Sequence, residues 1–377
     1  MNEATTMLTI VRSKRLKRMT TRKMIMKNKQ TIAVLKQCGW IPVWIALALT
    51  LGGCMAKNAP RPRFGSYATA TPGTTFLDGA DLGQHNYANF FFENNGVVYT
   101  CHGGHIDIVH LRIAADHVRY HYHRNKQMLM QSDRQFTFKL NVDPSIYYVS
   151  LTYPENWKTL PKDEKTAIAD EVALELAQHF TFMMKTWHEV LTFFGYKSMG
   201  IVPEFPSAFS WEDNYSNLLG VWMGTAAVRD TERDYNAAMT HALNETLQDL
   251  GVQSASVARA AAESMRGVWY EGNLMVTMKV RHIGIGLDDG TVSPMLVPGV
   301  CDDAEPRAYP TPTLSAVEKY GFKVALEVNP RVFEGRQILR VVCPEGDCKR
   351  VALPDDLPIL MDYIEQQGKV MGFDIVK

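Results

Sequence analysis

Apolar residues recur at helical spacing over most of the first two thirds of the chain. The longest such run predicts a helix over 163–194, which begins near Asp163 and ends at Gly195. Gly251 and Gly267 follow two further runs at the position where a left-handed helix end favours glycine. The spacing therefore also predicts helices over 104–124, 210–228, 232–250 and 254–266.

Alternating apolar and polar positions predict strands in two regions. Residues 136–142 and 146–152 alternate on either side of Asp143-Pro144-Ser145, as in a β-hairpin. Beyond residue 272 the pattern changes, with alternation over 273–287 and 322–342, a helical stretch over 355–367 and a short strand over 372–376. We expect an α+β fold. A mainly helical core domain would span 76–272, with a β-hairpin near 136–152, and a smaller mixed, β-rich C-terminal part would span 273–377.

A short apolar run near the beginning of the chain predicts export. Residues 40–51 are apolar, follow a basic stretch and precede Gly52-Gly53-Cys54. Twelve residues are too few for a helix across a hydrocarbon core of about 30 Å, which needs ~20. A basic region, a short apolar region and small residues before a cleavage point are typical of a secretory signal peptide, here 1–53. The alternative, a membrane-anchor helix with a chance cysteine, is disfavoured by Pro42 and by the small residues before Cys54.

The tetrad Leu51-Gly52-Gly53-Cys54 resembles a bacterial lipobox. This resemblance implies cleavage before Cys54, lipidation of its thiol and acylation of the new amino end. Stable anchoring needs more than one acyl chain, which this modification supplies. Met55 stands where enteric-type bacteria place an Asp to retain a lipoprotein at the inner membrane. We therefore expect attachment to the outer membrane, facing the periplasm, with 54–75 as a flexible tether.

The distribution of charged residues along the chain indicates which kinds of binding partner to expect. The chain has 40 Lys+Arg and 40 Asp+Glu, but ten of the basic residues and one acid lie in 1–36, so the remainder is net acidic by about nine charges. An acidic body argues against nucleic acid as a partner, because phosphate binding needs a basic surface. With 46% hydrophobic and 21% charged residues, the composition excludes disordered, collagen-like and coiled-coil chains. We expect membrane attachment and an envelope substrate or protein partner instead.

The cysteines fit an oxidising compartment, where pairing is favoured. Apart from Cys38 and Cys54, which the leader and lipidation account for, four remain: Cys101, Cys301, Cys343 and Cys348. Cys343 and Cys348 enclose a tight turn and would pair locally, which leaves Cys101 and Cys301 to pair by elimination. Four cysteines allow three connectivities, so the other pairings stay open. A zinc site built from these cysteines would need a second close pair, which is absent.

Six of the 11 histidines lie between residues 102 and 123. On a helix, Asp107, His110, His117 and His121 would fall within an arc of about 80°. An Asp-x-x-His step places a carboxylate and an imidazole one turn apart, as in metal sites inside helical bundles. Asp107 and His110 form the stronger pair. The alternative is a solvated or hydrogen-bonded stripe without a ligand.

The 163–194 helix carries ionisable residues within an otherwise strongly apolar sequence. Glu189 would lie within about 80° of Glu175 and His179, and such groups are costly to bury unless they are paired or bound to metal. His188-Glu189 also matches the start of the zinc-protease His-Glu-x-x-His signature. Thr192 stands where the second histidine would be, so a protease of that type is disfavoured.

The beginning of the next predicted helix, 210–228, holds a third group of candidate site residues. Glu212 and Asp213 stand at its first turn, and Asp213 and Asn217 would face the same way. Acids are also favoured at any helix N-terminus, so capping and ligation remain equal alternatives. Serine-hydrolase elbows, phosphate-binding loops and dinucleotide fingerprints are absent from the sequence, which disfavours those enzyme classes.

Four segments together resemble a bacterial family known as domain of unknown function 4056: 99–112, 186–189, 207–220 and 284–290. The likeness covers most of 75–340. Many members of the family look like exported lipoproteins, which agrees with the leader. The family name assigns no activity, so the resemblance implies no catalytic residues.

Two hypotheses follow for function. In the first, the chain is a hydrolase of an envelope substrate that uses zinc or another divalent metal, which lowers the pKa of bound water to about 7. The expected metal ligands are Asp107, His110, His188 and Asp213. Glu189, or alternatively Glu175, would act as general base, and Arg112 would bind an anionic substrate. In the second, the same residues form a buried polar network without cofactor, in a protein that binds or scaffolds an envelope partner.

Overall fold

The computed structural model describes residues 60–63, 69, 71, 73–140, 143–198, 201–273 and 276–377. Residues 59–377 form one compact unit. The predicted signal peptide, 1–53, and the predicted lipidation of Cys54 lie outside the described residues. Among the described helices, none has the length and apolar character needed to cross a bilayer.

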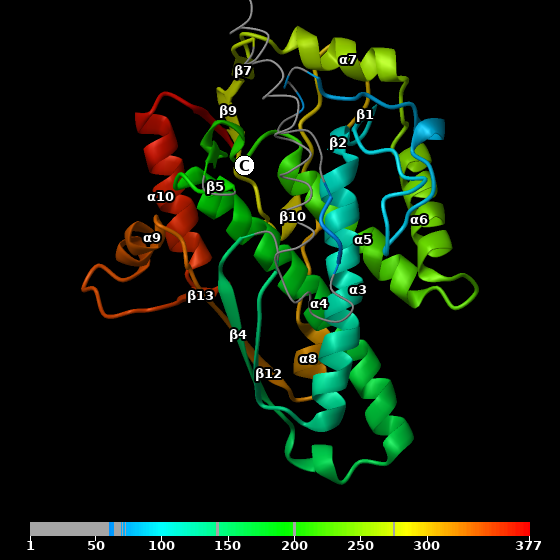
Figure 1. Cartoon of the computed structure of the whole chain (residues 1–377), viewed down its shortest axis with the longest axis vertical. Coiled ribbons are helices and arrows are strands. Elements are labelled where there is room, and N and C mark those ends of the chain that lie inside the picture. Colours follow the sequence, from blue (N-terminus) through cyan, green and yellow to red (C-terminus); the bar gives the residue numbers. More distant parts are fainter. Residues whose placement is uncertain are drawn as a thin grey trace, which may run out of the picture. The chain divides into compact units, whose positions relative to one another are not determined.

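Three long helices form the centre of this unit (Figure 1): α3 (Ile108–Gln131), α4 (Lys162–Phe193) and α5 (Asp213–Arg229). Two glycines on α5 bring it close to α3. A β-carbon at Gly220 would lie 2.2 Å from the carbonyl oxygen of Leu111, and one at Gly224 would lie 2.7 Å from that of Ala115. Only glycine permits this backbone approach.

A four-stranded sheet has the order β13-β12-β4-β3, with antiparallel neighbours throughout. Its strands are β3 (Gln135–Phe138), β4 (Ile146–Thr152), β12 (Lys323–Asn329) and β13 (Val351–Leu353). The register of β4 with β12 runs from Thr152 opposite Lys323 to Ile146 opposite Asn329. Alternate residues of β4 are buried, and the rings of Phe138 on β3 and Phe180 on α4 are in contact. Strands of the predicted core and of the C-terminal part thus share one sheet.

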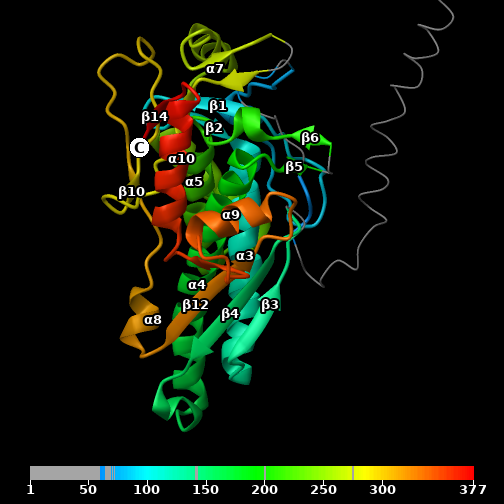
Figure 2. The same cartoon turned by 90° about the vertical axis from the view of Figure 1, so that its left-hand side faces the viewer.

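Shorter elements complete the fold (Figure 2). The other helices of the described residues are η1 (Gly79–Asp81), η2 (Glu155–Lys158), η3 (Phe205–Ser207), α6 (Tyr235–Asp249), α7 (Ala255–Ser264), α8 (Ser315–Lys319), α9 (Gly335–Val342) and α10 (Leu357–Val370). The antiparallel pairs are β1 (Val97–Thr100) with β2 (Gly104–Asp107), β5 (Lys197–Ser198) with β6 (Val202–Pro203), β7 (Tyr270–Glu271) with β8 (Thr277–Met278) and β10 (Thr291–Val292) with β11 (Tyr309–Pro310). β9 (Val280–His282) pairs in parallel with β14 (Asp374–Val376).

Three predicted elements differ from the structure. Of the 273–287 alternation, only β8 and β9 are strands among the described residues. Residues 104–107 are strand β2, and the helix begins only at Ile108, because the extended backbone of Asp107 makes it the N-cap. The 322–342 alternation is a strand only as far as Asn329. Pro330 follows directly and cannot donate to a strand ladder, and the chain turns into helix α9.

The predicted tether also differs in part. Arg63 and Thr69 lie in 54–75, which was expected to be flexible, yet both are buried against the body. Arg63 forms ion pairs with Glu93 and Asp116, and Thr69 donates two hydrogen bonds to Glu212. Composition alone did not reveal these partners, which lie 30 to 143 positions further along the chain.

The cysteines pair as predicted in one case and not in the other. Cys101 and Cys301 form a disulfide across 200 positions of sequence. Cys343 and Cys348 are free thiols, which corrects the prediction of a local disulfide. Their loop is closed by another interaction, in which the backbone N–H of Cys348 donates to the sulfur of Cys343 at 3.3 Å.

Candidate functional site

Six ionisable residues from three helix ends form what we call the His110 cluster: Asp107, His110, Lys185, His188, Glu189 and Asp213. α3 begins directly after Asp107 and α5 begins at Asp213, while α4 supplies the other three residues. Most of the cluster is buried. The side chains of His110 and His188 retain 26% and 19% exposure and give the cluster its contact with solvent.

His110 stands between two carboxylates. Its Nδ1 lies 3.2 Å from Oδ2 of Asp107 and 3.3 Å from Oδ1 of Asp213. Burial alone would lower the pKa of His110, but the charges of Asp107 and Asp213 outweigh it and raise the pKa to about 10. The imidazole is therefore a cation at neutral pH, held in a double ion pair.

Hydrogen bonds fix the two carboxylates. Oδ1 of Asp107 accepts the backbone N–H of Val109 at 2.7 Å and caps α3. Oδ2 of Asp213 accepts the hydroxyl of Ser210 at 2.9 Å. Burial raises the pKa of Asp213, and the His110 cation opposes this shift. Each carboxylate thus uses one oxygen for local structure and presents the other to His110.

Lys185 and Glu189 lie one turn apart on α4. Burial lowers the pKa of Lys185 to about 8, although nearby carboxylates, first that of Glu189, oppose the shift. Burial raises the pKa of Glu189 to about 8, and the charge of Asp213 adds to the effect. The Oε2 atom of Glu189 accepts the backbone N–H of Phe209 at 2.8 Å. An acid and a base that both titrate near pH 8 are typical of sites that transfer protons.

His188, which was expected to bind a metal ion together with Asp107, His110 and Asp213, faces Glu204 instead. Its Nε2 lies 3.5 Å from Oε2 of Glu204. Burial, together with the cations Lys185 and His110, lowers the pKa of His188 to about 3, so the ring is neutral at physiological pH. His188 therefore lies at the rim of the cluster, where it faces Glu204.

The structure does not support the predicted metal site. Within the part of the chain that is described, no group of three or more His, Cys, Asp or Glu side chains is placed to hold a metal ion. Asp107, His110 and Asp213 do come together, as predicted, but as ion pairs. His188, the fourth expected ligand, is directed to Glu204. The helical wheel could not predict this, because Glu204 lies outside α4, between β6 and η3.

Arg112 is not a substrate-binding residue. It is fully buried, and its Nη1 donates to the carbonyl of Asn94 at 2.8 Å and to Oδ1 of Asn95 at 3.0 Å. Its Nη2 donates to the carbonyl of Leu82 at 2.9 Å. The guanidinium therefore ties the 82–95 segment to α3, which corrects the prediction that it binds an anionic substrate.

Other candidates from the sequence are structural. His117 and His121 are buried on α3, and burial lowers the pKa of each, with the His121 ring packed against Phe138. Glu175 accepts the backbone N–H of Val317 at 2.8 Å at the beginning of α8. None of these three joins the His110 cluster.

Sequence reasoning missed Lys185. A lysine within a largely apolar stretch of α4 was the available signal, since a buried ammonium needs nearby carboxylates. For Glu212, capping and ligation were equal alternatives. It is buried beside Asp213, and burial together with that charge raises its pKa to about 7.

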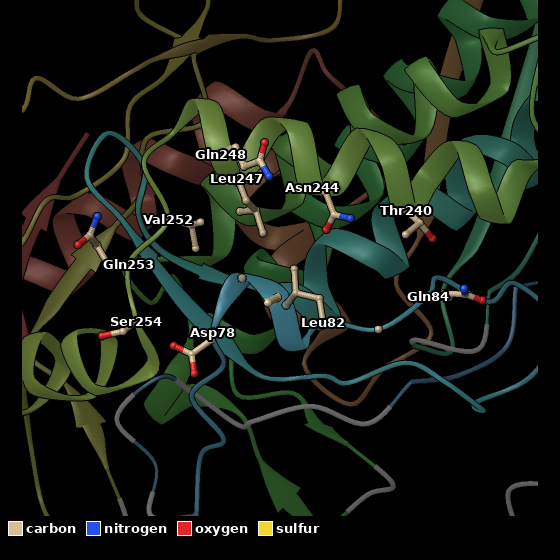
Figure 3. A pocket seen from close by; sticks show the side chains of 13 residues that line it. Asp78, Leu82, Gln84, Thr240, Asn244, Leu247, Gln248, Val252, Gln253 and Ser254 are labelled. Atoms are coloured by element: carbon tan, nitrogen blue, oxygen red, sulfur yellow. The ribbon is translucent and has the colours of Figure 1, made fainter.

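A separate cavity of about 630 Å³ lies against α6 (Figure 3). Leu82, Leu247 and Val252 supply apolar lining, and Asn244 and Gln248 project from one side of α6. None of the residues of the His110 cluster lines this cavity.

Comparison with known proteins gives one match. The model of the family described as "Protein of unknown function (DUF4056)" matches residues 73–282, more than half of the chain. The match covers every member of the His110 cluster. No curated protein and no solved structure matches the chain.

Proposed function

The chain belongs to the DUF4056 family of proteins of unknown function, and we propose that it is a lipid-anchored bacterial envelope protein whose His110 cluster hydrolyses an envelope substrate. The lipobox-like tetrad ending at Cys54 supports the anchoring, and Met55 supports the outer membrane as the destination. A lipid anchor in that membrane makes phospholipid, peptidoglycan and periplasmic peptides the accessible substrate classes.

The observation that carries the hydrolytic proposal is the pair Lys185 and Glu189. Hydrolysis needs a group that takes a proton from water and a group that returns one to the leaving atom. Glu189 and Lys185 both titrate near pH 8, so each can hold or release a proton near physiological pH. Glu189 is the general base in this proposal, as its place in the sequence predicted.

His110 has a second role in this arrangement. Because Asp107 and Asp213 keep it protonated, its partly exposed ring presents a positive charge at the solvent side of the cluster. A preorganised cation of this kind stabilises negative charge that develops on a substrate oxygen. No step of the proposal is assigned to a metal ion.

One observation favours the non-catalytic alternative. Lys185 and Glu189 are themselves buried, and one oxygen of Glu189 is held by the backbone of Phe209. A buried network of this kind can fix the crossing of three helices without any chemistry. In that case the protein binds or scaffolds an envelope partner, and substitutions in the cluster change stability alone.

The test is hydrolysis by the purified mature protein. Phospholipid vesicles, peptidoglycan and periplasmic peptides would each be incubated with wild type, and the products identified by mass spectrometry. We expect Glu189→Gln to lower turnover about 10²-fold or more, as for loss of a general base. The matched control is His241→Gln, which removes an exposed histidine paired with Glu245 on α6.

Two outcomes would contradict the hydrolytic proposal. One is the absence of turnover by wild type on all three substrate classes. The other is turnover by Glu189→Gln equal to that of the His241→Gln control. Either result would leave the non-catalytic alternative.

A further inference from the structure

Three consecutive phenylalanines project from the surface between η1 and β1. The exposed fractions of Phe90, Phe91 and Phe92 are 71%, 57% and 79%. Their rings contact one another, with centroids 4.6 Å apart for the first pair and 6.4 Å apart for the second. A contiguous exposed apolar patch of this kind marks a surface that contacts another apolar phase or a partner.

Hydrogen bonds from the backbone to asparagine side chains fix the conformation at the tip of this loop. The Oδ1 atom of Asn86 accepts the backbone N–H groups of Ala88 and Asn89 at 3.1 and 3.0 Å. The Oδ1 atom of Asn89 accepts the N–H of Phe91 at 3.0 Å. Short asparagine turns of this type fix the backbone locally. The phenylalanines therefore sit on a defined turn that directs them to solvent.

The base of the loop is equally constrained. Gly83 and Glu93 form an antiparallel bridge, and the N–H of Gln84 donates to the carbonyl of Phe92 at 2.9 Å. A β-carbon at Gly83 would lie 1.9 Å from that carbonyl oxygen, so the closure requires glycine. Phe92 itself has a left-handed backbone with φ of 69°, which is uncommon for a bulky residue. The fold keeps the patch exposed despite this strain.

The N-terminal segment joins the body at the same loop. The Nε of Arg61 and the Nη2 of Arg63 donate to the carbonyl of Asn86 at 3.1 and 3.2 Å. Both guanidinium groups also pair with Glu93, and Nη1 of Arg63 lies 2.5 Å from Asp116 on α3. Arg61 and Arg63, which follow Cys54 by seven and nine positions, are therefore bound at the base of the phenylalanine loop.

This attachment limits the distance between the loop and the anchor. Seven residue steps separate Arg61 from Cys54 in the sequence. A fully extended chain covers at most about 3.5 Å per step, so the α-carbon of Arg61 lies within about 25 Å of that of Cys54. Lipid on Cys54 would thus hold the loop close to the bilayer.

We infer that Phe90, Phe91 and Phe92 enter the interfacial region of the bilayer that holds the lipid on Cys54. The inference rests on the proposed anchoring. Aromatic and aliphatic side chains of surface-bound elements reach the boundary between headgroups and acyl chains, where burial of their apolar area is favourable. The lipid and the phenylalanine loop together give the protein two points of contact with the bilayer. These two contacts determine which face of the protein lies against the membrane.

The experiment uses the full chain in its own membranes. Phe91 would be replaced by the photoreactive residue p-benzoylphenylalanine, Phe91→p-benzoylphenylalanine, and the products of irradiation would be identified by mass spectrometry. The matched control is Phe333→p-benzoylphenylalanine, at a phenylalanine that is 98% exposed between β12 and α9. Both replacements keep an aromatic side chain at an exposed position, so the fold is retained.

We expect adducts with phospholipid acyl chains at position 91 in excess over position 333. Equal lipid yields at the two positions, adducts at 91 with a protein only, or no adduct at 91 would overturn the inference. The mass of the N-terminal peptide from the same sample tests the anchor separately. An unmodified Cys54 would refute the anchoring, whereas the lipid adducts would still decide the role of the loop.

Discussion

Thr69 directs two hydrogen bonds to a single oxygen of Glu212. Its backbone N–H donates to Oε1 at 2.9 Å and its hydroxyl donates to the same atom at 2.6 Å. Glu212 immediately precedes α5 and lies beside Asp213, so the N-terminal segment reaches the border of the His110 cluster. The segment that was expected to be a simple tether therefore contributes to the electrostatics of the candidate site.

Thr69→Val should change the ionisation of Glu212. The hydroxyl bond stabilises the carboxylate, so its loss raises the pKa of Glu212 above about 7 and lowers the free energy of unfolding by about 1–2 kcal/mol. A carbon-detected NMR titration and denaturant unfolding would measure the two effects. Thr166→Val removes an exposed hydroxyl on α4 and is the control. An unchanged Glu212 titration midpoint would contradict the prediction.

His110→Gln should remove a pH-dependent part of the stability. The folded-state pKa of His110 is raised to about 10 from 6.5, so its charge contributes stability that is fully present below pH 6.5 and is lost as pH rises through about 10. The difference in unfolding free energy between wild type and His110→Gln should shrink by up to a few kcal/mol over this window. Urea unfolding at several pH values would measure it.

The control for this experiment is His241→Gln. His241 and Glu245 are both exposed, and surface ion pairs contribute little to stability. We expect a small difference from wild type with no comparable trend between pH 6.5 and 10. A His110→Gln difference that stays constant over that window would show that the double ion pair does not hold the proton.

Arg63→Gln should destabilise the body strongly. Its guanidinium bridges Glu93 and Asp116, and the substitution removes this shared buried cation, which leaves Glu93 with Arg61 and Asp116 without an arginine partner. Breaking a buried ion pair from one side costs about 3–5 kcal/mol. Arg233→Gln, which removes an exposed pair with Asp230 on the surface, should cost less than about 1 kcal/mol. Equal thermal unfolding midpoints for the two variants would be inconsistent with docking of the 60–63 segment.

Cys301→Ser should lower the stability, because the disulfide with Cys101 links positions 200 residues apart. Loss of a native disulfide typically costs about 2–5 kcal/mol. Cys343→Ser should have a small effect, since Cys343 carries a free thiol that is half-buried. Unfolding in denaturant with and without a reductant would compare them. A reductant that left the unfolding of wild type unchanged would argue against the bond.

Local patterns in the sequence were sufficient for most of the helices, but not for α9, which lies within the predicted 322–342 strand. The 163–194 prediction matches α4, Lys162–Phe193, within one residue at each end, because the apolar spacing and the glycine after the helix are both local. The predictions for α6 and α10 were good for the same reason. The beginning of α3 was also not predicted. The short strand β2 and the cap residue Asp107 lie in an apolar run, and nothing in its pattern marks the change from strand to helix.

The site could be predicted only in part. Asp107, His110 and Asp213 were expected together on chemical grounds, and the ion pairs join them. The partners of His188 and Arg112 could not be predicted, because Glu204 and the carbonyl groups of residues 82 and 94 lie in loops without a periodic pattern. Burial of Arg63 depends on the same kind of distant contact.

Gly220 and Gly224 have a consequence for charge as well as for packing. Aligned peptide dipoles give the N-terminus of a helix about half a positive charge. α3 and α5 both begin at the His110 cluster, and the two glycines let the helices approach until a β-carbon would collide with the backbone of α3. The positive ends of two helices are therefore brought side by side, which favours the carboxylates of Asp107 and Asp213 between them. A single methyl group at Gly220 would force these ends apart. Although Gly220 lies seven residues after Asp213, the substitution would therefore weaken the electrostatic field of the two helix ends around His110.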